Sequence, residues 1–377
     1  MQMVDLKGQY MRIKGEVNAA IQDVIDHTEF INGPKLKEFA QNLNDYLGGC
    51  HVITCANGTD ALQIALMALG LKPGDEVIVP AFTYVASAEV IGMIGLTPVM
   101  VDVDLETFNV TVDNIRDGLT DKTKAIIPVH LFGQSCDMEP IMKFAREHEL
   151  YVIEDNAQAI GAEYTFSDGH QEKTGTMGTI GCTSFFPSKN LGCYGDGGAI
   201  FCKDDTLAER LRMIANHGQK VKYHHDIIGC NSRLDSIQAA VLNVKLKYLD
   251  EYGQVRRDAA HYYSEQLKAF DPEQQYFVTP VELEKSTHVY HQYTLKIKNG
   301  KRDTLKQYLA EAGIPSMIYY PLPLQEQEAF KQIARAGGSL NVAKELADSV
   351  LSLPIHTEMT REMQNQVIDS VIGFFKR

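Results

Sequence analysis

The chain lacks the cysteine patterns that mark disulfide-stabilised and zinc-binding proteins. Its 377 residues include seven cysteines, an odd number, and no two of them form a C-x-x-C pair. A disulfide framework favours an even number, and a zinc knuckle needs closely spaced pairs. The count therefore favours reduced thiols in a cytoplasmic protein and predicts no metal site of this kind.

Signal-like, membrane-spanning and basic segments are missing as well. Residues 1–10 contain no basic stretch followed by an apolar run, so no signal peptide is predicted. The most apolar long stretch, residues 84–101, is interrupted by Glu89 and Pro98 and is too broken for a membrane span. The net charge of −13 disfavours nucleic acid and anionic membranes as partners, since both would be repelled.

A regular alternation of short β-branched runs and helix-like runs extends from residue 51 to about residue 155. Helices are predicted to begin near Thr59, Tyr84, Val112 and Met138. The predicted strands cover residues 52–55, 77–80, 98–102, 125–129 and 152–154. Alternation at this spacing predicts an α/β fold with a mostly parallel sheet and helical crossovers.

The length favours two domains that share one active site. We predict a large domain over residues 1–250, whose N-terminal arm, about residues 1–30, can pack on the other domain. A smaller C-terminal α+β domain is predicted over residues 251–377, with one strand at 293–297.

Asp155 follows the last predicted strand of the alternating region, in the segment EDNAQ at 154–158. Ligands of open α/β sheets bind beyond the carboxyl ends of the strands. A carboxylate at such a position can hold the proton on the ring nitrogen of pyridoxal 5′-phosphate (PLP), which keeps the ring an electron sink. Capping of the following helix explains Asp155 equally well on its own.

Lys189 lies 34 residues later, between apolar and small residues and just before a glycine-rich segment at 192–198. A lysine that forms a Schiff base needs a low-dielectric pocket, so that part of the population is neutral at the working pH. Such a lysine can also move a proton during the reaction. A solvated surface charge, the ordinary role of a lysine, fits this setting poorly.

Three further positions are candidates for binding the same cofactor. Gly58 and Thr59 open a helix directly after a strand, and the free amides of a helix start attract phosphate. Ser184, five residues before Lys189, can donate a hydrogen bond to the phosphate. Phe82, after the next strand, can stack on the ring or pack in the core, and the sequence favours neither.

Together these segments resemble the DegT/StrS-type sugar aminotransferases, which are fold-type-I PLP enzymes, along nearly the whole chain. The matching segments are NGTDAL at 57–62, PGDEVI at 73–78, PVHLFG at 128–133, EDNAQ at 154–158, SFFPSK at 184–189, GDGG at 195–198 and NSRLD at 231–235. The resemblance implies that Lys189 forms the Schiff base, that Asp155 holds the ring nitrogen, and that Gln158 lies against the ring. It also implies a homodimer in which Asn231 reaches the cofactor phosphate of the neighbouring subunit.

A narrower resemblance concerns the substrate. The segments YHH at 223–225 and YPLPL at 320–324 are similar to those of the branch that acts on UDP-2-acetamido-2-deoxy-3-oxo-glucuronate, with glutamate as amino donor, for surface polysaccharide. The carboxylate of a uronate needs a cation, and Arg233 is the candidate because a guanidinium fits a carboxylate. An interface or structural ion pair is the alternative role for Arg233. Tyr320 is expected to contact the sugar, and packing alone is its alternative role.

Three other functions remain to be weighed. A related sugar dehydratase carries His in place of the lysine, and Lys189 argues against it. A 4-keto-6-deoxy nucleotide sugar has no carboxylate and would not need Arg233. A non-catalytic sensor of the same fold would be expected to have lost cofactor-binding residues, yet Lys189, Asp155, Gln158 and Ser184 are all present.

Overall fold

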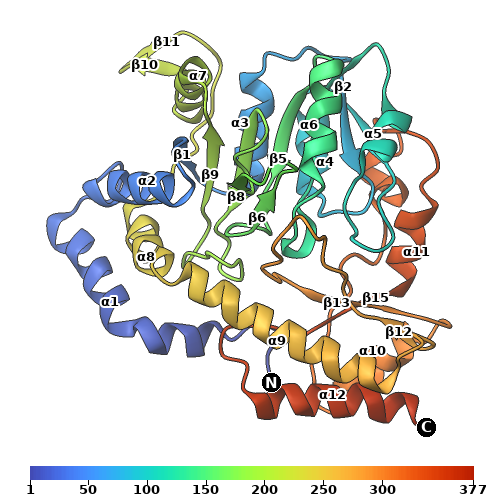
Figure 1. The fold of residues 1–377 in the computed structure, drawn as a ribbon. Coiled ribbons are helices and arrows are strands. Elements are labelled where there is room, and N and C mark those ends of the chain that lie inside the picture. The colour runs from blue at the N-terminus through green and yellow to red at the C-terminus, as the bar shows by residue number, and fades with distance from the viewer.

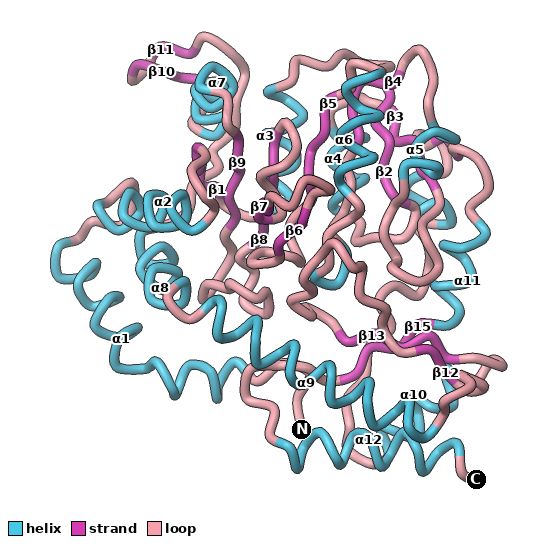
Figure 2. Tube along the Cα trace, in the orientation of Figure 1, coloured by secondary structure: helices cyan, strands magenta, loops and turns pink.

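The computed structural model describes residues 1–377 and contains one large sheet, a smaller three-stranded sheet and helices packed around both (Figures 1 and 2). The large sheet has the order β1-β9-β8-β5-β4-β2-β3-β14. Its strands are β1 (His51–Cys55), β2 (Glu76–Pro80), β3 (Thr97–Val101), β4 (Thr123–Ile126), β5 (Tyr151–Asp155), β8 (Ile180–Ser184), β9 (Gly198–Cys202) and β14 (Arg335–Ala336). The predicted α/β class is confirmed.

One strand departs from the parallel arrangement. β9 pairs antiparallel with both β1 and β8, whereas the other neighbouring strands are parallel. The chain between β8 and β9 contains Lys189 and the glycine-rich segment and forms no helix. Without a helical crossover it turns back and places β9 beside β8 in the opposite direction.

Both faces of the large sheet are buried, as the continuous apolar strands require. Val77 and Val79 of β2 belong to the main core cluster, whereas Ile78 between them belongs to a second cluster on the opposite face. The main cluster includes residues of α3 (Gly58–Ala68), α4 (Ala86–Met93) and α7 (Asp205–Ala215), and the second includes residues of α5 (Val112–Gly118) and α6 (Met138–Glu147). The helices predicted near 59, 84, 112 and 138 therefore lie where the sequence placed them.

The C-terminal part builds the smaller sheet, in the order β12-β13-β15. The strand predicted at 293–297 is β13. This part contains α9 (Leu249–Phe270), β12 (Phe277–Val278), β13 (Tyr293–Ile297), α10 (Arg302–Glu311), α11 (Asn341–Ser349), β15 (Val350–Leu353) and α12 (Arg361–Phe375). One segment returns to the large sheet, because β14 pairs with β3 and because Leu324, Phe330 and Leu346 join the main core cluster. This segment lies beyond residue 250 but packs on the large sheet. The division into two domains at residue 250 remains a prediction.

The N-terminal arm contacts both parts of the molecule. Ile13 and Val17 of α1 (Leu6–His27) pack with Val241 and Val244 of α8 (Ser236–Leu246). On the same helix Arg12 forms ion pairs with Glu251 at 2.7 Å and with Glu358 at 3.2 Å. The remaining elements are α2 (Pro34–Tyr46) and two hairpins, β6 (Glu163–Thr165) with β7 (Gln171–Lys173) and β10 (Gln219–Val221) with β11 (His224–His225). None of the helices is long and apolar enough to cross a membrane.

Candidate active site

A cavity of about 490 Å³ lies beyond the carboxyl ends of β5 and β8, beside the start of α3. This is the edge at which the sequence placed a ligand. Seven of the predicted residues line it, namely Gly58, Thr59, Asp155, Gln158, Ser184, Lys189 and Tyr320. Tyr320 comes from the C-terminal part, so the cavity is built from both parts of the chain.

The start of α3 forms one end of the cavity. The side chain of Asn57 accepts a hydrogen bond from Asp60 N at 2.8 Å, which caps the helix. The amides of Gly58 and Thr59 have no intrahelical acceptor, as in the first turn of any helix, and can bind an anion. A Cβ on Gly58 would lie 2.7 Å from Ser184 Cβ, so only glycine lets this helix start approach the serine so closely.

The carboxylate of Asp155 is buried at the floor of the cavity, 5% exposed. Ser87 Oγ donates to Asp155 Oδ2 at 2.7 Å, and Ala157 N donates to Asp155 Oδ1 at 3.1 Å. Both contacts hold the carboxylate in one orientation. An oriented carboxylate is therefore available to a protonated ring nitrogen.

Lys189 lies in the irregular loop after β8, where its amide donates to Phe186 O at 2.8 Å. Burial lowers the pKa of its ammonium to about 8, and the opposing attraction of Asp155 only partly offsets this effect. The side chain remains partly accessible, because it lines the cavity. Near neutral pH a usable fraction of Lys189 is consequently a neutral amine, the nucleophilic form.

Gln158 and Tyr320 form a polar contact across the cavity wall. Gln158 Oε1 accepts from Phe132 N at 2.8 Å, and Gln158 Nε2 donates to the Tyr320 hydroxyl at 3.1 Å. Burial raises the pKa of the Tyr320 hydroxyl above its usual range, so this hydroxyl stays protonated. It can therefore donate a hydrogen bond to a ligand while it accepts one from Gln158.

Phe82 does not line the cavity, and of the two roles that the sequence left open the structure shows packing in the core. Its side chain is 1% exposed and lies in the main core, with ring centroids 6.4 Å from Phe108 and 6.1 Å from Tyr320. Tyr84, two residues later, lines the cavity and is 56% exposed. Tyr84 is the aromatic residue of this segment that can reach a bound ring.

Asn231 and Arg233 lie outside the cavity of their own chain. They flank Ser232, whose hydroxyl accepts from Ala56 N at 3.0 Å and donates to Asp60 Oδ2 at 2.7 Å. These contacts tie the segment to the start of α3. Arg233 makes one long hydrogen bond, 3.5 Å to Asn216 Oδ1, and no ion pair, so the structural ion pair considered from the sequence is not formed within the chain.

One group behind the cavity and one group that lines it were missed from the sequence. Ser87 of α4 is fully buried and contacts Asp155 from behind the cavity, and no motif marks it. His291 lines the cavity, is 6% exposed, and has a buried Nδ1 without a hydrogen-bond partner. Burial, with a smaller contribution from Lys189, lowers its pKa well below the usual value, so its imidazole is neutral.

These groups fit PLP. Asp155 suits the ring nitrogen, Lys189 suits the aldehyde carbon, and the α3 amides with Ser184 suit the phosphate. The fit rests on the close approach that Gly58 permits and on the buried, oriented carboxylate.

Comparisons with known proteins agree with this fit. The model of the DegT/DnrJ/EryC1/StrS aminotransferase family matches residues 11–372. A pleiotropic regulatory protein of Geobacillus stearothermophilus is 45% identical over 374 residues, 99% of this chain and 98% of that protein. The UDP-2-acetamido-2-deoxy-3-oxo-D-glucuronate aminotransferase of Pseudomonas aeruginosa is 45% identical over 356 residues, 94% and 95% of the two chains.

A relative that acts on another sugar is similar too. The dTDP-3-amino-3,4,6-trideoxy-alpha-D-glucose transaminase of Streptomyces venezuelae is 38% identical over 374 residues, 99% of this chain and 96% of that one. Among solved structures, S. venezuelae DesV in complex with a ketimine intermediate superposes with a TM-score of 0.93 at 38% identity, covering 100% of this chain and 98% of that one.

The depressed pKa of Lys189 predicts a stability effect in the cofactor-free protein. Between pH 8 and 10.5 Lys189 is protonated in the unfolded chain but mostly neutral in the folded chain. The free energy of unfolding therefore rises with pH over this range. Below pH 8 both states are protonated, and burial of the charged ammonium destabilises the folded state by its full amount. At about 1.4 kcal/mol per pH unit this cost is at most about 3.5 kcal/mol. Lys189→Met should therefore be more stable than wild type at pH 7, by a margin that shrinks toward pH 10.5.

Urea denaturation at pH 7 and at pH 10 measures this margin. Lys7→Met is the control, because Lys7 is exposed on α1 and makes no ion pair. A Lys189→Met protein that is less stable than wild type at pH 7, or a margin that does not change with pH, would contradict the assignment.

Proposed function

The chain belongs to the DegT/DnrJ/EryC1/StrS aminotransferase family and is a PLP-dependent sugar aminotransferase, and on this premise we propose a specific reaction. It transfers the amino group of glutamate to UDP-2-acetamido-2-deoxy-3-oxo-glucuronate and yields the 3-amino sugar for surface polysaccharide. The main support for the catalytic role is that Lys189, Asp155, Gln158 and Ser184 all line one cavity.

The proposed roles follow from the contacts of each side chain. When bound, PLP supplies an electron sink and an amino-group carrier. Asp155, oriented by Ser87, holds a proton on the ring nitrogen, and Ser184 with the amides of Gly58 and Thr59 holds the phosphate. Lys189 Nζ accepts and returns the proton at the reacting carbon, because its pKa of about 8 lets it populate both forms near neutral pH.

The choice of a uronate rests on the Pseudomonas aeruginosa relative and on Arg233. This guanidinium is half-buried, has no carboxylate partner in its own chain, and lies beside the anchored Ser232. We place it, with Asn231, at the cavity of a neighbouring subunit, where it binds the sugar carboxylate. Tyr320, which lines the cavity, contacts the sugar.

A homodimer is part of this proposal. The β10–β11 hairpin stands away from the body of the chain at the end of α7 (Figure 1). The hairpin and the irregular segment that follows it expose three large apolar side chains, Val221 at 61%, Tyr223 at 78% and Ile228 at 86%. Apolar side chains gathered on a projecting segment favour burial against another subunit.

Two alternatives have specific support. The Streptomyces venezuelae relative favours a dTDP-linked deoxy sugar, for which Arg233 would have no carboxylate to bind. The name of the Geobacillus stearothermophilus relative favours a regulatory role. The intact cavity residues argue for catalysis in either case, because a sensor needs no lysine with a lowered pKa.

The reaction predicts a change in the absorbance of the bound cofactor. Purified wild-type protein loaded with PLP should show a visible band, and glutamate should remove this band because Lys189 Nζ would be freed in the transfer of the amino group. UDP-2-acetamido-2-deoxy-3-oxo-glucuronate should restore the band. Lys189→Ala should lack the original band. A protein that stays colourless after incubation with PLP would overturn the catalytic function and favour the regulatory one.

The proposed role of Arg233 leads to a prediction about substrate specificity. Arg233→Gln should lower kcat/KM for the UDP-linked 3-oxo uronate about 100-fold, because a charge-assisted pair with the carboxylate is lost. Its kcat/KM for a neutral keto sugar on the same nucleotide should change less than about threefold. Equal losses with both sugars would show that Arg233 supports the interface rather than the substrate.

A further inference from the structure

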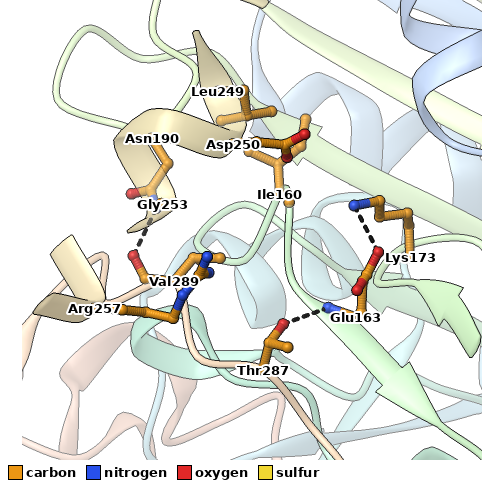
Figure 3. Close-up of a pocket in the computed structure, with 11 residues that line it drawn as sticks. Ile160, Glu163, Lys173, Asn190, Leu249, Asp250, Gly253, Arg257, Thr287 and Val289 are labelled. Atoms are coloured by element: carbon orange, nitrogen blue, oxygen red, sulfur yellow. Dashed lines mark hydrogen bonds and ion pairs between the residues drawn. The ribbon is translucent and has the colours of Figure 1, made fainter. Parts of the chain in front are cut away.

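A second cavity, of about 250 Å³, lies between α9, the β6–β7 hairpin and residues 287–289 (Figure 3). It shares no lining residue with the active-site cavity. The two are nevertheless adjacent, because Asn190 lines the second cavity and directly follows Lys189.

The charged groups around this cavity are incompletely matched. Lys173 and Glu163 neutralise one another at 2.9 Å. Arg257 has no carboxylate within ion-pair distance, and its guanidinium donates only to Gln254 Oε1 at 2.8 Å. Figure 3 shows Arg257 and the Lys173–Glu163 pair turned toward the same space from opposite sides. One positive group therefore faces the cavity without a partner.

Asp250 is the matching negative group. Its carboxylate accepts from the Tyr46 hydroxyl at 2.7 Å and has no cation within ion-pair distance. Asp250 and Arg257 are seven residues apart on α9 and so lie on the same face of this helix. The cavity thus offers one unmatched cation and one unmatched anion from a single helix face.

Gly253 lies between these two residues on that face. Glycine in the interior of a helix lowers stability relative to alanine, so it needs a compensating reason. Close packing is not that reason, since a Cβ at Gly253 would meet Arg257 Nη1 at 3.5 Å and Val289 Cγ1 at 3.9 Å, which are ordinary contacts. What the missing side chain leaves is open space in front of Arg257.

Asn190 provides an independent sign of a missing partner. Its side chain is 5% exposed, and its Nδ2 donates to Val289 O at 2.9 Å. Its Oδ1 is buried and makes no hydrogen bond. A buried acceptor at a cavity wall without a partner lacks a donor that a ligand can supply.

We propose that this cavity binds a free α-amino acid, with the carboxylate on Arg257 and the ammonium on Asp250. A zwitterion satisfies both unmatched charges, whereas a simple anion would leave Asp250 unpaired beside it. An ammonium also supplies a donor toward Asn190 Oδ1. Since Asn190 and Lys189 are consecutive, a ligand that orders Asn190 also restrains the peptide that carries the active-site lysine.

The test measures the melting temperature of the purified holoenzyme in its pyridoxamine 5′-phosphate form, with which glutamate does not react, as glutamate is titrated. Glutarate, which also does not react with this form, is the analogue that lacks the ammonium. Glutamate should raise the melting temperature more than glutarate does. Arg257→Gln should need at least about tenfold more glutamate for the same shift, because a charge-assisted contact is lost. Gly253→Ala should weaken the response because its methyl group occupies space in front of Arg257, although its own melting temperature rises.

Matched controls separate this site from the active-site cavity. Gly15→Ala changes a glycine of α1 whose added Cβ would meet nothing within 4 Å, so it should raise the melting temperature and keep the glutamate response. Arg146→Gln, an exposed arginine of α6 without an ion pair, should also keep it. A wild-type response in both Arg257→Gln and Gly253→Ala, or no response in wild type, would overturn the proposal.

Discussion

The ammonium of Lys189 is held where burial disfavours its charge and where no carboxylate forms an ion pair with it. Asp155 is near enough to offset this only in part, so the pKa falls to about 8. The surrounding loop depends on glycine for the same compactness. A Cβ on Gly198 would lie 2.5 Å from the carbonyl of Asn57, and one on Gly192 would lie 2.4 Å from Pro187 O. These close contacts of the backbone require glycine at both positions.

Two neighbouring carboxylates of β5, Glu154 and Asp155, point to opposite faces of the sheet and have different roles. Glu154 is fully buried and accepts from Gly175 N at 2.8 Å and Met177 N at 2.7 Å. His130 Nδ1 accepts from Cys136 N, so its Nε2 carries the proton and donates to Glu154 at 2.8 Å. Glu154 therefore fixes the loops behind the sheet, while Asp155 remains free to face the cavity.

The order of motifs and strands predicted most of the sheet and five cavity residues, because strand ends in a parallel sheet meet at one edge. Gln158 and Tyr320 were predicted from the family resemblance instead. Contacts set by packing alone could not be predicted in this way. The hydrogen bond from Ser87 to Asp155 is one example. Phe82 and Tyr84 follow β2, which ends at Pro80, so the alternation of a strand no longer fixes which of the two faces the cavity. The antiparallel direction of β9 was not predicted either, because no local pattern in the loop between β8 and β9 indicates that the chain turns back there.

The central claim is that position, and not a lowered pKa alone, makes Lys189 the reactive lysine. Burial also lowers the pKa of Lys245 to about 8, yet Lys245 is 1% exposed and donates to Gly192 O at 2.6 Å instead of lining the cavity. Reduction of the holoenzyme with sodium borohydride, followed by peptide mass mapping, distinguishes the two. The account predicts the cofactor on the Lys189 peptide only. Cofactor on the Lys245 peptide, or on no lysine, would contradict it.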